Sequence, residues 1–155
     1  TDMLRAQSIG RQTGNIPTAL ARGHKSNERP NRRELGAIHE IRLTNNYTPY
    51  PALVEFGYGK DGTEVHNYWD EGYPVTFSDP QVKSITLVRD GKARVLLATW
   101  NGEPATVTMK PHAAQLGFEV SKVTDVRAKQ ALDTTKDGSV TLQLEGYSTR
   151  LLDLE

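Results

Sequence analysis

Residues 82–110 read VKSITLVRDGKARVLLATWNGEPATVTMK, and this stretch decides the fold of the chain. Two turn dipeptides, Asp90-Gly91 and Asn101-Gly102, divide it into runs rich in apolar residues over 82–89, 93–100 and 105–110. Asp-Gly and Asn-Gly tolerate the positive φ angles of type I′ turns, whose twist matches that of paired antiparallel strands. The stretch therefore predicts a meander of three consecutive antiparallel strands.

The side-chain patterns of these runs differ, and they predict how each strand is covered. Residues 94–98 are nearly all apolar, which is typical of a central strand covered on both faces. Residues 105–110 alternate between apolar and polar side chains, as a half-exposed strand does. After a turn or short helix near 111–116, we expect further strands at 119–125, 139–144 and 149–154. About seven short strands with regular turns indicate a β-sandwich or barrel.

The first 73 residues lack this pattern and predict a different architecture. We expect helices over 1–12 and 30–42, a short strand over 15–20, and a helix opening at 52–56. Because this part has few large apolar residues, we interpret residues 1–73 as an α/β segment, the tail of a barrel domain. The alternative is that it packs helices directly onto the sandwich. The predicted fold class is mainly β, with an antiparallel β-sandwich over 74–155.

Composition excludes several classes of function. The chain has 19 basic and 19 acidic residues, and such a balance argues against nucleic acid or an anionic membrane as partner. It has no cysteine, so disulfides and thiolate metal sites are excluded. No stretch approaches the roughly 20 apolar residues of a membrane span, and no signal peptide is recognisable. Because the chain opens with Thr1-Asp2-Met3, we expect a fragment, a processed product or a trimmed chain.

The motifs for catalysis, cofactors and metals are incomplete. Residues 57–62 match the glycine spacing of a dinucleotide-binding loop, but 63–69 make a poor helix start, so we expect a glycine-rich turn. His39-Glu40 begins like a zinc-protease helix, yet Leu43 stands where the second histidine is needed. No local pattern marks a carboxylate pair for glycoside hydrolysis. We therefore expect no catalytic residue, no metal site and no cofactor.

Aromatic side chains are the best candidates for a sugar contact, because the C–H face of a pyranose packs on a flat ring. Tyr68 and Trp69 are adjacent at the proposed junction, and Trp100 ends a predicted strand. Tyr68 and Trp69 are candidates for binding substrate. Their alternative role is to hold the two parts of the chain together, and the alternative for Trp100 is a core or rim aromatic.

Several stretches resemble the passage from catalytic barrel to C-terminal β-sandwich in bacterial glycoside hydrolases of the β-N-acetylgalactosaminidase-like group. These stretches are Asn67-Tyr68-Trp69, Pro74-Val75, 79–83, 88–101, 107–110, 123–126 and 146–152. Residues 14–18 resemble a late barrel strand, and active sites lie at the C-terminal ends of such strands. If so, Arg22 and His24 become candidates for substrate contact.

The resemblance implies a non-catalytic C-terminal portion of a glycoside hydrolase, in which the sandwich braces the carbohydrate-active barrel. The implied partners are a carbohydrate and the remainder of the barrel, in the same or a companion chain. The resemblance favours a periplasmic or extracellular location, and we expect the chain alone to be inactive. The alternatives are a free-standing carbohydrate-binding module and a structural or adhesion sandwich without a ligand.

Overall fold

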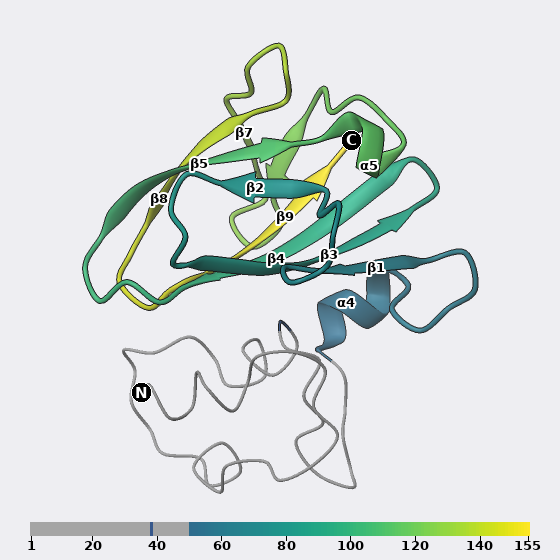
Figure 1. The fold of residues 1–155 in the computed structure, drawn as a ribbon, viewed down its shortest axis with the longest axis horizontal. Helices are drawn as coiled ribbons and strands as arrows, with labels where there is room; N and C mark the ends of the chain where they lie inside the picture. The colour runs from purple at the N-terminus through teal and green to yellow at the C-terminus, as the bar shows by residue number, and fades with distance from the viewer. Residues whose placement is uncertain (1–37, 39–49) are drawn as a thin grey trace, which may run out of the picture.

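The computed structural model describes residue 38 and residues 50–155, which form two antiparallel sheets that face each other (Figure 1). The six-stranded sheet consists, in spatial order, of β1 (Glu64–Asn67), β3 (Val82–Arg89), β4 (Lys92–Thr99), β9 (Thr149–Leu154), β6 (Val123–Asp125) and β7 (Gln130–Leu132). The three-stranded sheet consists of β2 (Val75–Phe77), β5 (Ala105–Pro111) and β8 (Val140–Leu144). Over residues 50–155, two short helices accompany them, α4 (Pro51–Phe56) and α5 (Ala113–Leu116).

This architecture confirms the predicted mainly β class. The predicted helices over 1–12 and 30–42 and the strand over 15–20 lie, except for residue 38, outside the described residues, and so does the greater part of the predicted barrel segment. The predicted division of the chain at residues 73 and 74 stays a prediction. Residues 64–67, which precede it, pair with β3 as strand β1.

The hairpin β3–β4 forms as predicted from Asp90-Gly91. Asp90 has φ 51° and Gly91 has φ 71°, so both central residues adopt the positive angles of a type I′ turn. The pairing runs without a break from the turn to the far ends of the two strands, where Val82 lies opposite Thr99. Seven of the eight residues of β4 are buried, which confirms a central strand covered on both faces.

The predicted pairing of the third strand of the meander is wrong, because β5 leaves the sheet instead of pairing with β4. The other neighbour of β4 is β9, and β5 lies in the three-stranded sheet between β2 and β8. Asn101 and Gly102 form a corner in which Tyr147 donates its backbone N–H to the Asn101 carbonyl at 2.7 Å. β5 has one apolar face, which suits a sheet with one side in solvent, whereas β9 buries side chains on both sides of the sheet.

Local pattern failed to predict the shortest strands. β1, β2 and β7 have four, three and three residues, too few for a two-residue period to stand out. The region after the glycine-rich turn, interpreted as a poor helix start, is strand β1 and pairs with β3. The strand predicted over 119–125 is confirmed only for its last three residues. β1 and β2 each pair with a longer strand, β3 and β5, which supplies their hydrogen bonds, whereas β7 pairs with the equally short β6.

The sandwich core lies between the two sheets. The three-stranded sheet contributes Val75, Val107, Met109, Val140, Leu142 and Leu144. The six-stranded sheet contributes Val82, Val88, Ala93, Val95, Leu97, Val123, Leu152 and Leu154. The polar exceptions are Ser84 and Thr86 of β3, which are completely buried. A buried hydroxyl without a partner is costly, so these two side chains need a hydrogen-bonding group inside the core.

Tyr73 supplies that group. Its hydroxyl lies 2.5 Å from the Ser84 Oγ and 3.1 Å from the Thr86 Oγ1. Burial raises the pKa of Tyr73 to about 12, because the phenolate form would lose its hydration. The network therefore depends on a protonated tyrosine.

We expect the folded state to lose stability between pH 10 and pH 12. Tyr73 ionises near pH 10 in the unfolded chain and about two units higher in the folded state, so the unfolded state binds fewer protons in this window. Its contribution, present below pH 10, falls by about 2 to 3 kcal/mol across the window. Urea unfolding at pH 9 and pH 11.5 measures the loss. Tyr73→Phe should lose less stability over the same interval, and an equal loss in both proteins would contradict this role.

Two chain crossings between the sheets meet at one end of the sandwich. The corner after β4 contains Gly102, and the turn between β8 and β9 contains Gly146. A Cβ at Gly146 would collide with the carbonyl group of Gly102, which is backbone and cannot rotate away. At Gly102 the nearest atoms to a Cβ would belong to the side chain of Tyr147, with its hydroxyl oxygen at 3.3 Å. The close approach at Gly146 fixes how the two crossings pass each other.

Gly146→Ala should therefore destabilise the domain more than Gly102→Ala. Forcing one extra methyl group against backbone costs about 1–3 kcal/mol, and the cost at Gly102 should be smaller because a side chain yields. Chemical denaturation of the two variants checks the order. Equal midpoints for both variants and the original chain would show that the crossings are loosely packed.

Candidate functional site

The six-stranded sheet has a second apolar face, which points away from the three-stranded sheet. We call it the outer face. Its buried members are Ile85, Leu87, Leu96, Ala98 and Leu151, none more than 2% exposed. They arise from alternation along β3, β4 and β9, whose neighbouring residues point into the sandwich core. Antiparallel sheets commonly leave such a face to solvent, so an apolar outer face marks a packing surface.

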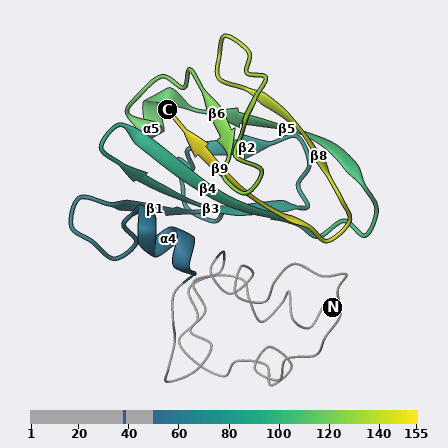
Figure 2. The same cartoon turned by 180° about the vertical axis from the view of Figure 1, so that it is seen from behind.

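Helix α4 lies against the outer face, on the side opposite β2 and β5 (Figures 1 and 2). Leu53 of α4 is 2% exposed and belongs to the same cluster as the outer face, together with the buried Ile38. The helix begins at Pro51, whose missing N–H costs nothing in the first turn. It ends at Gly57, where φ is 127°. The predicted helix over 52–56 is thus confirmed.

A buried arginine links α4 to the sheet. Arg94 donates from Nε and Nη2 to the two carboxylate oxygens of Asp153, at 2.6 and 2.7 Å. Its Nη1 donates to the carbonyl oxygen of Ala52 at 2.8 Å, and its guanidinium lies 5.1 Å from the ring centroid of Phe56. The hydrogen bond with Asp153 raises the pKa of Arg94, so the guanidinium stays charged. One side chain therefore connects two strands and the helix.

A second arginine reaches the residue that precedes α4. Arg127 donates from Nη2 to the hydroxyl of Tyr50 at 3.0 Å, and from Nη1 to the Thr149 Oγ1 at 2.8 Å. Arg94 and Arg127 thus hold α4 and its N-terminal neighbour to the outer face through charge-assisted hydrogen bonds. Sequence reasoning missed both. A single charged residue inside the apolar run 94–98 was the available signal for Arg94.

Aromatic side chains surround the outer face. Tyr50, Phe56, Tyr58, Tyr68 and Trp100 pack partly against its buried cluster. The ring of Tyr68 meets that of Trp69 edge to face, with centroids 4.8 Å apart and an angle of 80° between the planes. The Lys83 ammonium lies 5.2 Å from the centroid of the Tyr68 ring. Trp100 is thus a rim aromatic, which is one of the two roles predicted for it.

Two of the four predicted site residues belong to the part of the chain that the structure describes. Tyr68 and Trp69 are both half-buried and lie together, and whether they contact substrate stays a prediction. Arg22 and His24 lie outside the described residues. Residues 57–62 form a turn between α4 and β1, as predicted, with Gly57, Gly59 and Gly62 at positive φ.

The described part of the chain contains no group of three or more His, Asp or Glu side chains placed to hold a metal ion. Within residues 38 and 50–155, no helix has the length and apolar character needed to cross a membrane.

Three solved structures illustrate what the chain is similar to. The first is a GH27 β-L-arabinopyranosidase from Geobacillus stearothermophilus, at 18% identity and a TM-score of 0.40, over 54% of this chain and 20% of that one. An α-galactosidase I from Mortierella vinacea matches with 14% identity and a TM-score of 0.39, over 84% of this chain and 29% of that one. An α-amylase from Malbranchea cinnamomea matches with 18% identity and a TM-score of 0.30, over 78% of this chain and 19% of that one. The chain spans about a fifth of the length of the first of these. No curated protein matches it.

A family model places the chain more narrowly. The model of the glycoside hydrolase 123 C-terminal domain matches residues 53–143, from within α4 to within β8. Glycoside hydrolase 123 is a β-N-acetylgalactosaminidase family, so the resemblance predicted for the sandwich is confirmed. Because the matched residues make up more than half of its length, the chain belongs to the family of glycoside hydrolase 123 C-terminal domains.

Proposed function

We propose that this chain is the non-catalytic C-terminal portion of a glycoside hydrolase, and that its outer face braces the catalytic barrel of the parent enzyme. The observation that carries this proposal is an apolar sheet face buried on the side away from the sandwich core. A sandwich needs only one apolar face on each sheet to close its own core. A second one needs a second packing layer.

The position of α4 supports the barrel as that layer. α4 belongs to the part of the chain that leads into the sandwich, and it already covers one portion of the outer face. Full burial of each large aliphatic side chain contributes about 1.5–3 kcal/mol, and the outer face has four of them besides Ala98. A helix-covered sheet is a stable layer arrangement, and helices form the outer ring of a (β/α) barrel. In this proposal residues 1–73 lead from the end of the barrel domain into the sandwich over 74–155, to whose six-stranded sheet they contribute β1.

The carbohydrate partner follows from the family. As part of a glycoside hydrolase 123 protein, the chain would serve hydrolysis of a glycan that carries β-linked N-acetylgalactosamine. Tyr68 and Trp69 lie at the rim of the outer face, and there an aromatic pair could extend a substrate cleft of the barrel. Arg22 and His24 are proposed as further substrate contacts. The remainder of the barrel would come from the same chain or a companion chain.

The 155-residue chain should not hydrolyse an aryl β-N-acetylgalactosaminide, whereas the parent protein, which includes the sequence upstream of residue 1, should. The reason is that no carboxylate pair for glycoside hydrolysis is recognisable in this sequence. The absorbance of the released aryl alcohol measures the activity of both proteins. Turnover by the 155-residue chain above a heat-denatured control would contradict the proposal, and so would an inactive parent protein.

Arg94→Met should loosen the attachment of α4 to the outer face. The variant leaves the Asp153 carboxylate and the Ala52 carbonyl without their donor, and we expect a loss of about 2–3 kcal/mol in the free energy of unfolding. In the parent enzyme it should shorten the half-life of activity at elevated temperature and leave kcat/KM at room temperature unchanged.

The matched control is Lys92→Met, two residues away on the same strand. It removes the exposed pair with Glu155, and exposed pairs contribute little. If the two variants shortened the half-life of the parent enzyme equally, Arg94 would have no special part in bracing.

A further inference from the structure

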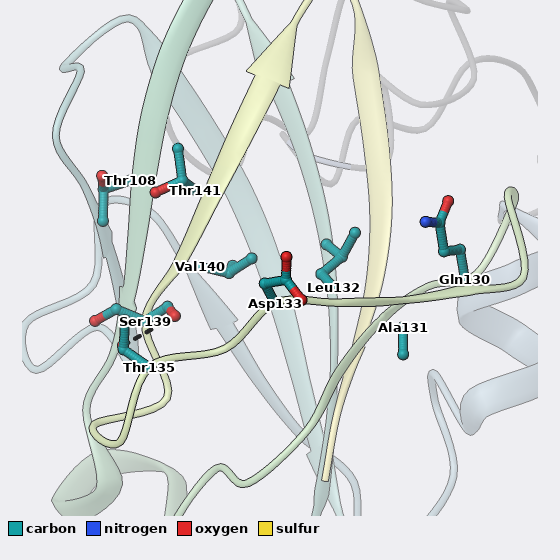
Figure 3. A pocket seen from close by; sticks show the side chains of 9 residues that line it. All are labelled: Thr108, Gln130, Ala131, Leu132, Asp133, Thr135, Ser139, Val140 and Thr141. Atoms are coloured by element: carbon teal, nitrogen blue, oxygen red, sulfur yellow. Dashed lines mark hydrogen bonds between the residues drawn. The ribbon is translucent and has the colours of Figure 1, made fainter.

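A groove of about 480 Å³ opens along an edge of the sandwich that is free among the described residues (Figure 3). β7 is the last strand of the six-stranded sheet, and β8 is an edge strand of the three-stranded sheet. The two edges border the groove, together with the connection between β7 and β8 and with Thr108 of β5. Ligand sites in proteins commonly have volumes of about 300–1,000 Å³, so the groove has room for a small ligand or part of a chain.

The groove carries polar side chains with unused hydrogen-bonding capacity. Thr108 and Thr141 lie directly opposite each other on β5 and β8, and both are exposed (Figure 3). Gln130 and Asp133 line the groove from β7 and the residue that follows it. Among the described residues, none of these four side chains has a hydrogen-bond partner or an ion pair. By contrast, Thr106 and Gln143 on the same sheet face are bonded to each other at 2.8 Å.

The connection that forms one wall of the groove is held in place before any ligand arrives. Thr135 donates its backbone N–H to the Ser139 carbonyl at 3.0 Å and its hydroxyl to Asp137 Oδ1 at 2.5 Å. Gly138 has φ 77°, and a Cβ there would strike Val120 at 2.8 Å, so the turn is packed tightly against its neighbours. Because this connection is already ordered, ligand binding would cost little of its conformational entropy.

The polar groups and the charge of the groove identify a class of ligand. Two hydroxyls, an amide and a carboxylate offer donors and acceptors together, and a sugar presents hydroxyls that both donate and accept. Ala131 and Leu132 supply an apolar part of the lining, against which the C–H groups of a sugar ring can pack. The lining residues within the described part of the chain include no Lys or Arg, and Asp133 would repel an anion.

We propose that this groove is a binding site for a neutral carbohydrate chain. The proposal goes beyond barrel bracing, since the groove lies at the free edge and uses neither the outer face nor α4. Failure of the bracing proposal would leave it untouched, and its own failure would leave the bracing proposal untouched.

The test is a titration of the 155-residue chain, labelled with ¹⁵N, with three neutral tetrasaccharides built from β-N-acetylglucosamine, β-galactose and α-glucose. At least one should shift the amide signals of Thr108, Asp133 and Thr141, and leave those of the remote turn residues Gly59 and Asp61 in place. A sulfated form of the same tetrasaccharide should bind more weakly, because Asp133 repels it. Absence of shifts with all three, or tighter binding of the sulfated form, would overturn the proposal.

A double variant then ties binding to the groove. Thr108→Val combined with Thr141→Val removes both hydroxyls and keeps β-branched side chains that suit a strand, so the Kd should rise about tenfold. The control Thr106→Val lies on the same strand face outside the groove and should leave the Kd unchanged. Unfolding midpoints of all variants confirm that they are folded. Equal weakening by the control, or no weakening by the double variant, would place the ligand elsewhere and refute the assignment.

Discussion

The structure depends on the central strand pair β3–β4, whose apolar side chains point to both faces of one sheet. Leu97 and Val95 point toward the three-stranded sheet, whereas Leu96 and Ala98 point toward α4. Such a pair cannot remain at the surface of a two-layer sandwich, because burying only one face would leave the other in water. The three-stranded sheet covers the inner face, and α4 with its neighbours covers part of the outer face.

Charged and polar groups then determine how these layers are held. Arg94 stands in the most apolar strand, where Asp153 neutralises its charge and a helix carbonyl accepts a further hydrogen bond from it. Tyr73 plays a comparable part inside the sandwich, where it satisfies two buried hydroxyls of β3. A purely apolar surface would hold α4 without fixing its orientation, whereas directional hydrogen bonds specify one position.

The two sides of the domain suggest a division of roles. The outer face is apolar and rimmed by aromatic side chains, which suits packing against another layer of the same protein. The free edge between β7 and β8 is polar and open, which suits a soluble ligand. In the two proposals made above, the outer face stabilises the parent enzyme and the groove binds a carbohydrate chain.

The sequence by itself determined the β3–β4 hairpin, because the Asp90-Gly91 turn and the apolar run beside it act between neighbouring residues. It also pointed to the glycoside hydrolase family of the sandwich through its strand and turn residues. Only the tertiary structure decided that β5 leaves the sheet, that short strands such as β1 form, and that Arg94 meets Ala52. These outcomes rest on contacts between residues far apart in the chain, where side-chain period and turn chemistry carry no information.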